Sequence, residues 1–198
     1  MDTLTLNLPN TVGLTDEQFY QLCVANEQWR FELSKEGELI IKSPLCSEYY
    51  STSSELVDEL LNWNHYKKVG FVFPGATVFR LQEGIYRSPD ISWILRERWE
   101  ALSSDEKQRF PQICPDFVVE IRTPDVCLEK LQTKMTEYIE NGVRLGWLID
   151  LESAMVEIYR VESEIELLNF PADKGLTLWG EDVLPGFAVD FSPIAYSQ

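Results

Sequence analysis

Histidine is nearly missing from this chain of 198 residues, and cysteine occurs without any ligand-type spacing. With His65 alone, no metal site built from several histidines can form, and a Ser-His-Asp or Cys-His arrangement would have to use that one residue. The four cysteines include no C-x-x-C pair, so neither a zinc site nor a disulfide framework is indicated. The phosphate-cradling patterns G-x-G-x-x-G and G-x-x-x-x-G-K-[ST] are absent too, which leaves nucleotide-cofactor chemistry without support.

Long apolar runs are also lacking. No run approaches the roughly 18 to 20 residues that a membrane-spanning helix needs, and the N-terminus lacks a basic and apolar signal sequence. We therefore expect a cytoplasmic protein with no membrane partner. No linker rich in Pro, Gly or Ser divides the chain, and 44% of its residues are hydrophobic. Residues 1–198 are accordingly predicted to form one domain with its own core.

Positive charge is scarce, because 17 Lys and Arg residues stand against 33 Asp and Glu residues, for a formal net charge of −16. This balance weighs against casual binding to nucleic acid, since phosphate contacts need Lys and Arg. The deficit is uneven, however. Residues 80–149 hold 10 basic and 12 acidic side chains, so the middle of the chain is its least acidic part. The objection is weakest for a site in this segment.

The β-type run Phe117–Ile121 contains an acid among apolar residues. Its composition and its flanking prolines, Pro115 and Pro124, are typical of a strand buried on both faces. A carboxylate there costs several kcal/mol unless it is paired, hydrogen-bonded or bound to a cation. Side chains alternate along a strand, so Glu120 and Arg122 point the same way. One interpretation is a structural ion pair between these two residues.

A second acid, Asp90, follows Pro89 at the start of another β-type run. Two carboxylates on neighbouring strands, with basic groups nearby, form the oxygen-ligand set that Mg²⁺ favours. The helix predicted after Pro124 adds Lys134, which flanks the apolar stripe of that helix. We expect its ammonium either to lie along the apolar surface or to return to the end of the strand that bears Glu120.

The remaining patterns predict a mixture of helices and strands. Thr15 opens a capping box, Lys35-Glu-Gly joins two strands of a hairpin, and Ser103 caps a later helical turn. Helices are expected at 15–26, 51–67, within 96–110 and after Pro124, and strands near 29–33, 38–42, 71–73, 77–81, 86–94, 117–121, 145–149, 155–159 and 164–168. The fold class is therefore α/β, with a mixed central β-sheet flanked by helices.

Several of these segments, taken in order, resemble the Uma2 family, a family abundant in cyanobacteria that belongs to the PD-(D/E)XK nuclease superfamily. The likeness extends from the Phe31-Glu-Leu segment to Leu184-Pro-Gly-Phe. Its most specific parts are Pro89-Asp90, Pro115-Asp-Phe-Val-Val-Glu120 and Lys134-x-x-x-Tyr138-x-x-x-Gly142. The resemblance implies a restriction-endonuclease-like core, with an N-terminal helix and a β-hairpin as additions.

The same resemblance implies a metal-dependent reaction. Asp90 and Glu120 would bind one Mg²⁺ or Mn²⁺ together with the backbone carbonyl of Ile121, and Glu55, on the helix at 51–67, would act as an outer metal ligand. A solvent-exposed role for Glu55 is the alternative. The implied reaction is hydrolysis of phosphodiester bonds in DNA, with RNA as the second substrate to consider.

One position departs from the superfamily motif. Arg122 stands where the superfamily has a lysine two residues after the acid. Arginine stays protonated, so it can contact the scissile phosphate but cannot act as a neutral base. The resemblance implies that the role of that lysine, orienting or deprotonating the attacking water, moves to Lys134.

Two other functions remain open from the sequence. The strong acidity and the missing lysine beside Glu120 favour a catalytically inactive binding or scaffold protein that keeps the fold, as a homodimer built from aromatic surfaces. A glycosidase that uses Asp90 and Glu120 as acid and base is a further alternative, although no spacing requires it.

Overall fold

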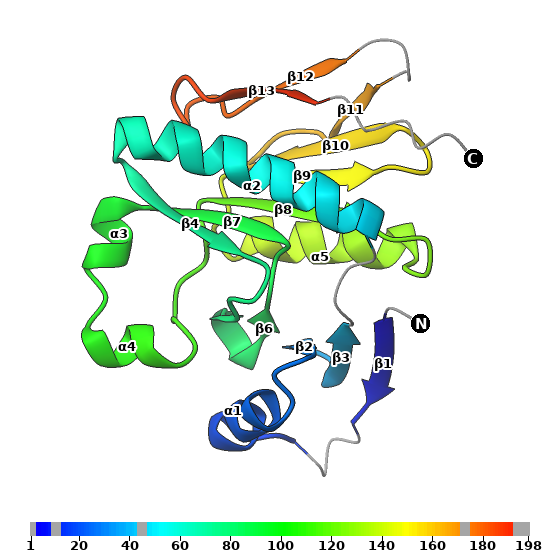
Figure 1. Cartoon of the computed structure of the whole chain (residues 1–198). Helices are drawn as coiled ribbons and strands as arrows, with labels where there is room; N and C mark the ends of the chain where they lie inside the picture. The colour runs from blue at the N-terminus through cyan, green and yellow to red at the C-terminus, as the bar shows by residue number, and fades with distance from the viewer. Residues whose placement is uncertain (1–2, 9–12, 43–46, 171–174, 192–198) are drawn as a thin grey trace.

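Two large sheets organise the computed structural model, which describes residues 3–8, 13–42, 47–170 and 175–191 (Figure 1). The larger sheet has six strands in the order β11-β10-β9-β8-β7-β4. These are β4 (Gly70–Pro74), β7 (Ile91–Leu95), β8 (Phe117–Arg122), β9 (Leu145–Asp150), β10 (Met155–Arg160) and β11 (Glu166–Asn169). Strands β8 and β9 are parallel and the other neighbours antiparallel, so the predicted mixed sheet is confirmed.

Helix α5 (Leu128–Glu140) connects β8 to β9. Parallel neighbours need a crossover connection, and a helix that packs back on the sheet supplies it. Met135 and Tyr138 of α5 are fully buried against residues of these two strands. Gly146 permits the close approach, because a Cβ built at this position would lie 2.5 Å from Met135 Cε. Both β8 and α5 lie where the sequence predicts them.

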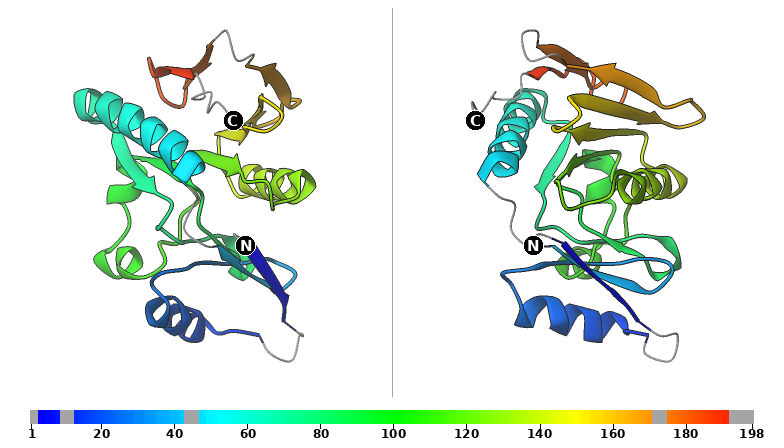
Figure 2. Two further views of the ribbon diagram at one scale, coloured as in Figure 1. Left: turned by 45° about the vertical axis from the view of Figure 1, so that its right-hand side comes forward. Right: turned by 90° about the vertical axis from the view of Figure 1, so that its right-hand side faces the viewer.

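The two faces of the six-stranded sheet are covered by different layers (Figure 2). On one face, helix α2 (Ser47–Lys67) and the hairpin of β12 (Leu176–Trp179) and β13 (Ala188–Phe191) enclose an apolar core. On the other face lies α5 with a second apolar cluster. Alternation along β8 assigns Phe117, Val119 and Ile121 to the α2 face and Val118 to the α5 face. Glu120 therefore points toward the α5 face.

The smaller, N-terminal sheet lies below the first in Figure 1 and has the order β1-β3-β2-β6-β5. Its strands are β1 (Thr3–Asn7), β2 (Arg30–Leu33), β3 (Glu38–Lys42), β5 (Phe79–Arg80) and β6 (Tyr86–Arg87). Helix α1 (Asp16–Ala25) packs on it through Phe19 and begins with the predicted capping box of Thr15 and Gln18. The predicted hairpin is confirmed as β2 and β3, whereas β1 has no counterpart among the predicted strands.

The run predicted as one strand at 86–94 is two strands in two different sheets. β6 belongs to the N-terminal sheet and β7 to the six-stranded sheet, and Ser88-Pro89-Asp90 passes between them. Proline has no N–H to donate to a strand ladder, so pairing is interrupted at Pro89. The prediction of a single strand was therefore wrong at this point, and Asp90 lies at the junction of the sheets.

The remaining elements are short. A 3₁₀ turn at Gln82–Gly84 joins β5 to β6, and the predicted helical insert consists of α3 (Arg96–Glu100) and α4 (Ser104–Gln108). Ser103 and Glu106 form the predicted capping box of α4. Within the ranges described above, no helix combines the length and the apolar character that crossing a bilayer would require.

Candidate active site

Glu120 is held on the α5 face of β8 by two side chains of helix α5. Its side chain is 1% exposed, and its Oε1 lies 2.6 Å from Lys134 Nζ and accepts a hydrogen bond of 3.1 Å from Tyr138 OH. Lys134 and Tyr138 are four residues apart on α5, so one helix face presents both. The expectation that the Lys134 ammonium returns to the strand agrees with these contacts.

Asp90 reaches β8 from the junction between the sheets. The pairing of Ile91 with Val119 places Asp90 opposite Glu120 on the neighbouring strand. One carboxylate oxygen, Oδ2, accepts a hydrogen bond of 2.9 Å from the Ile121 N–H, and the other, Oδ1, lies 2.9 Å from Arg30 Nη1. The two acids are thus fixed side by side by the sheet ladder.

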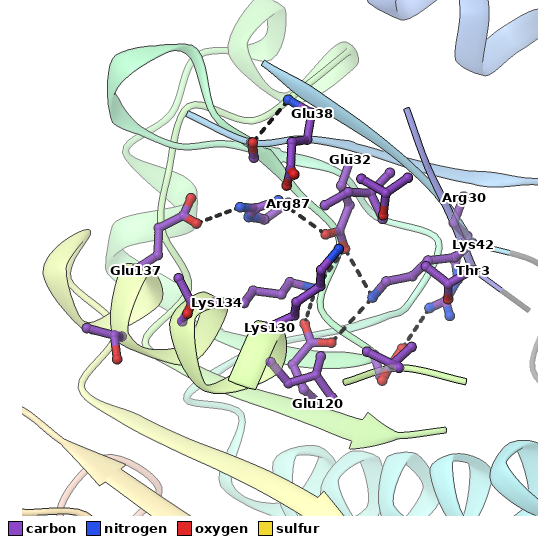
Figure 3. A pocket seen from close by; sticks show the side chains of 18 of the residues that line it. Thr3, Arg30, Glu32, Glu38, Lys42, Arg87, Glu120, Lys130, Lys134 and Glu137 are labelled. Atoms are coloured by element: carbon purple, nitrogen blue, oxygen red, sulfur yellow. Dashed lines mark hydrogen bonds and ion pairs between the residues drawn. The ribbon is translucent and has the colours of Figure 1, made fainter. Parts of the chain in front are cut away.

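A cavity of about 570 Å³ lies between the two sheets and α5, and Figure 3 shows the charged side chains in it. Asp90, Glu120 and Lys134 all line this cavity, so the structure brings together three of the predicted site residues. The N-terminal sheet forms the other wall through side chains of β1, β2 and β3. The hairpin that the resemblance implies as an addition, together with β1, therefore supplies one wall of the candidate site.

The N-terminal sheet places one opposite charge against each of the three predicted residues. The pairs are Arg30 with Asp90 at 2.9 Å, Lys42 with Glu120 at 3.4 Å and Glu32 with Lys134 at 2.8 Å. Lys42 Nζ also lies 3.2 Å from Glu32 Oε1. Glu32, Asp90, Glu120 and Lys134 are all buried, so each of these charges needs the partner that it has.

The pairing shifts the titration of the buried groups. Burial alone would raise the pKa of Asp90, but the charges of Lys42 and Arg30 outweigh it and hold the pKa below its usual value. For Lys42, burial acts to lower the pKa, and the nearby Glu120 and Glu32 carboxylates reverse this and raise it. For Lys134, burial prevails and lowers the pKa although Glu120 and Glu32 oppose it.

Arg87 extends the charge network from Glu32 to Glu137 of α5. Its Nη2 lies 2.6 Å from Glu137 Oε2, and its Nη1 lies 3.5 Å from Glu32 Oε2. The side chain is 5% exposed and lines the cavity, yet Nε and Nη1 have no hydrogen-bond partner in the part of the chain that the structure describes. Buried N–H groups without a hydrogen-bond partner are costly, so an acceptor that reached them would be stabilised.

Arg122 lies apart from this network. The guanidinium Nη1 is 2.8 Å from Asp150 Oδ2, Nε donates to the Val126 carbonyl at 3.1 Å, and the residue is not part of the cavity lining. Arg122 and Asp150 face each other in the parallel β8–β9 register, which explains their pairing. The structural ion pair considered between Glu120 and Arg122 does not form. Glu120 pairs with Lys134, and Arg122 pairs with Asp150.

Glu55 is not brought to the cavity. Its side chain is exposed on α2, the helix that covers the opposite face of the sheet from the one toward which Glu120 points. The sheet itself separates Glu55 from Asp90 and Glu120. Its expected role as an outer metal ligand has no support in this arrangement.

Two carboxylates that line one cavity with room for several waters are a donor set that suits Mg²⁺ or Mn²⁺, since such ions take one or two protein carboxylates and keep several waters. Asp90 and Glu120 would hold the ion. In the described ranges, no three acidic, histidine or cysteine side chains are grouped closely enough for a metal site made of protein ligands alone. The two carboxylates thus suit a divalent ion. In this structure Lys42 neutralises Glu120 and Arg30 neutralises Asp90.

Sequence reasoning missed the three charged residues that pair with the predicted site residues: Arg30, Glu32 and Lys42. A usable signal existed for one pair. In the run Arg30-Phe-Glu-Leu, alternation puts Phe31 and Leu33 in the N-terminal core and Arg30 and Glu32 on the other side. An acid and a base that share one side of a hairpin strand indicate a buried polar face. The sequence contains no comparable signal that connects Lys42 with Glu120 or Glu32.

Comparisons with known proteins bear on the family and the fold. The model of the Uma2 family, described as "Putative restriction endonuclease", matches residues 16–192. Among solved structures, the fold is similar to that of a "putative nuclease belonging to DUF820" from Anabaena variabilis, with a TM-score of 0.71 and 20% sequence identity over 89% of this chain and 94% of the other. No curated protein matches the sequence. Because the family match spans nearly all of the chain, the chain belongs to the Uma2 family of restriction-endonuclease type.

Proposed function

We propose that this protein hydrolyses phosphodiester bonds in DNA with the help of Mg²⁺ or Mn²⁺. The observation that carries the proposal is the convergence of Asp90, Glu120 and Lys134, from a sheet junction, a strand and a helix, on one cavity. Fold membership alone would not support an activity, because many functions share one fold. Acids paired with a lysine in a cavity are the arrangement that this reaction needs.

Each residue has a distinct role in the proposed reaction. Asp90 and Glu120 would hold the ion, which would offset charge on the phosphate oxygens. Lys134 Nζ, fixed by Glu120 at 2.6 Å, donates a hydrogen bond to the attacking water and orients it toward phosphorus. Tyr138 OH steadies the Glu120 carboxylate by its hydrogen bond of 3.1 Å.

The charge of the cavity supports access by a phosphate group. Six of the 17 basic residues of the chain line it, against seven acids, so the cavity is nearly neutral in a molecule of net charge −16. Arg87 lines the cavity from β6 with two nitrogen atoms, Nε and Nη1, that have no hydrogen-bond partner among the described residues, and Lys130 lines it from α5. We propose that these two residues, rather than Arg122, contact the substrate phosphates.

The test compares two glutamates that are close in sequence. Wild-type protein, Glu120→Gln and Glu129→Gln are incubated with supercoiled plasmid and Mn²⁺, and nicked product is followed by gel electrophoresis. Glu129 lies on α5 outside the cavity, so its variant should nick as the wild type does. Glu120→Gln should lower the rate by about 100-fold or more, since the ion loses a ligand and Lys134 loses its anchor.

Equal nicking by wild type and Glu120→Gln would assign the activity to a contaminant and contradict the proposal. Absence of nicking by every variant, on DNA and on a single-stranded RNA substrate, would instead favour the inactive binding protein that the acidity of the chain suggests. Cleavage of RNA alone would keep the mechanism and change the substrate.

A further inference from the structure

Lys42 has an unusual position in the candidate site. It is the last residue of β3, and its ammonium lies 3.4 Å from Glu120 Oε2 and 3.2 Å from Glu32 Oε1, with 13% of the side chain exposed. Figure 3 shows it between these two carboxylates. Asp90 also attracts it. A protein cation therefore sits among the acids that would hold a divalent ion.

The two lysines of the site differ in how closely they are held. Lys134 Nζ makes contacts of 2.6 and 2.8 Å with Glu120 and Glu32, whereas Lys42 contacts the same two carboxylates at 3.4 and 3.2 Å. Contacts beyond about 3.2 Å are weak hydrogen bonds. Lys42 is the looser cation, and its flexible four-carbon stem allows it to leave without moving the strand.

A divalent ion bound to Glu120 would lie within a few ångströms of the Lys42 ammonium, and like charges at this separation repel strongly in a partly buried site. We propose that Lys42 competes with the metal: its ammonium neutralises the acids while the ion is absent and withdraws when the ion binds. The residue thereby sets the metal concentration at which the site becomes loaded. This inference rests on the proposed metal site at Asp90 and Glu120.

The test is a Mn²⁺ titration of the full chain by isothermal calorimetry, without any substrate. Lys42→Met keeps the length of the side chain and removes its charge, and it should bind Mn²⁺ at least about tenfold more tightly than the wild type, equivalent to about 1.4 kcal/mol. Lys35→Met is the matched control, because Lys35 lines the same cavity from the same hairpin but is paired with the exposed Glu83. Its affinity should stay within about twofold of the wild type.

The gain should also depend on the proposed ligand. Adding Glu120→Gln to Lys42→Met should abolish the tighter binding, and Lys42→Arg, which keeps the charge, should bind as weakly as the wild type. Thermal melts with and without Mn²⁺ confirm folding, and Lys42→Gln replaces Lys42→Met if that variant does not fold. A charge-free variant that binds Mn²⁺ within about threefold of the wild type, or more weakly, overturns the inference.

The titration separates this inference from the proposed function. Tighter Mn²⁺ binding by Lys42→Met, with no nicking by any variant, supports the competition and contradicts the nuclease. Nicking that depends on Glu120, with unchanged affinity in Lys42→Met, leaves the nuclease standing and overturns the competition alone.

Discussion

The two faces of the six-stranded sheet are built by the same strands but have different chemistry. Against α2, Phe117, Val119 and Ile121 of β8 join a continuous apolar core. Against α5, the same strand presents Glu120 to a cavity lined by charged side chains from both sheets. One face stabilises the fold and the other holds the candidate chemistry. Substitutions on the two faces should therefore affect different properties of the protein: stability on the apolar face, and charge balance and activity on the charged face.

The largest loss of stability is expected on the apolar face. Trp147 of β9 is 1% exposed and packs on Phe117 and Phe187, so Trp147→Ala should lower the free energy of unfolding by about 4 kcal/mol. Urea denaturation measures the loss. Trp179→Ala, at a tryptophan that is 62% exposed on β12, is the control and should change stability by less than about 0.5 kcal/mol. Similar losses in both variants would remove the distinction between core and surface.

On the charged face, the loss should depend on charge balance rather than on volume. Lys134→Met removes the closest cation of both Glu120 and Glu32 in a buried site and should lower the free energy of unfolding by about 3 kcal/mol. Lys42, which still contacts both carboxylates, keeps the loss from being larger. Adding Glu32→Gln should recover part of this loss, since it removes one of the two carboxylates that lost a cation. A double-mutant cycle, with stability measured by urea denaturation, gives the coupling energy between Lys134 and Glu32. Additive losses would show that the stability of this face does not depend on charge balance.

The smallest effect is expected for the acid on the other side of the sheet. Glu55→Ala should leave Mn²⁺-dependent nicking within about twofold of the wild type, because the sheet separates Glu55 from the cavity. The rate is measured beside that of Glu120→Gln. A loss comparable to that of Glu120→Gln would restore Glu55 as a metal ligand and remove the contrast between the faces.

Much of the fold was predictable because its signals are local. The capping residues Thr15 and Ser103 and the apolar stripe of α5 depend on neighbours a few residues away. The break between β6 and β7 was missed because the run at 86–94 keeps its β-type composition while the chain changes sheets. Periodicity reports which way a side chain points but gives no sheet membership.

The candidate site was only partly predictable for a related reason. Asp90, Glu120 and Lys134 were found because each acid or base stands in an apolar context and because their order resembles a family pattern. Their opposite charges come from residues 60 to 102 positions away in sequence, which no local pattern connects. Arg122 illustrates the same limit for a single residue. Alternation along the strand predicted the direction of its side chain, but its ion-pair partner, Asp150, lies on the neighbouring strand β9 and could not be predicted.

The position of Asp90 depends on both sheets, because the segment Ser88-Pro89-Asp90 connects them. Its backbone follows a strand of one sheet and precedes a strand of the other, and its carboxylate is bonded to Ile121 of the second. A slip by one residue in either ladder would turn every following side chain to the opposite surface, and Asp90 with it. Correct alignment of both ladders is thus a precondition for an intact acid pair, so an error of register in either of them would separate Asp90 from Glu120.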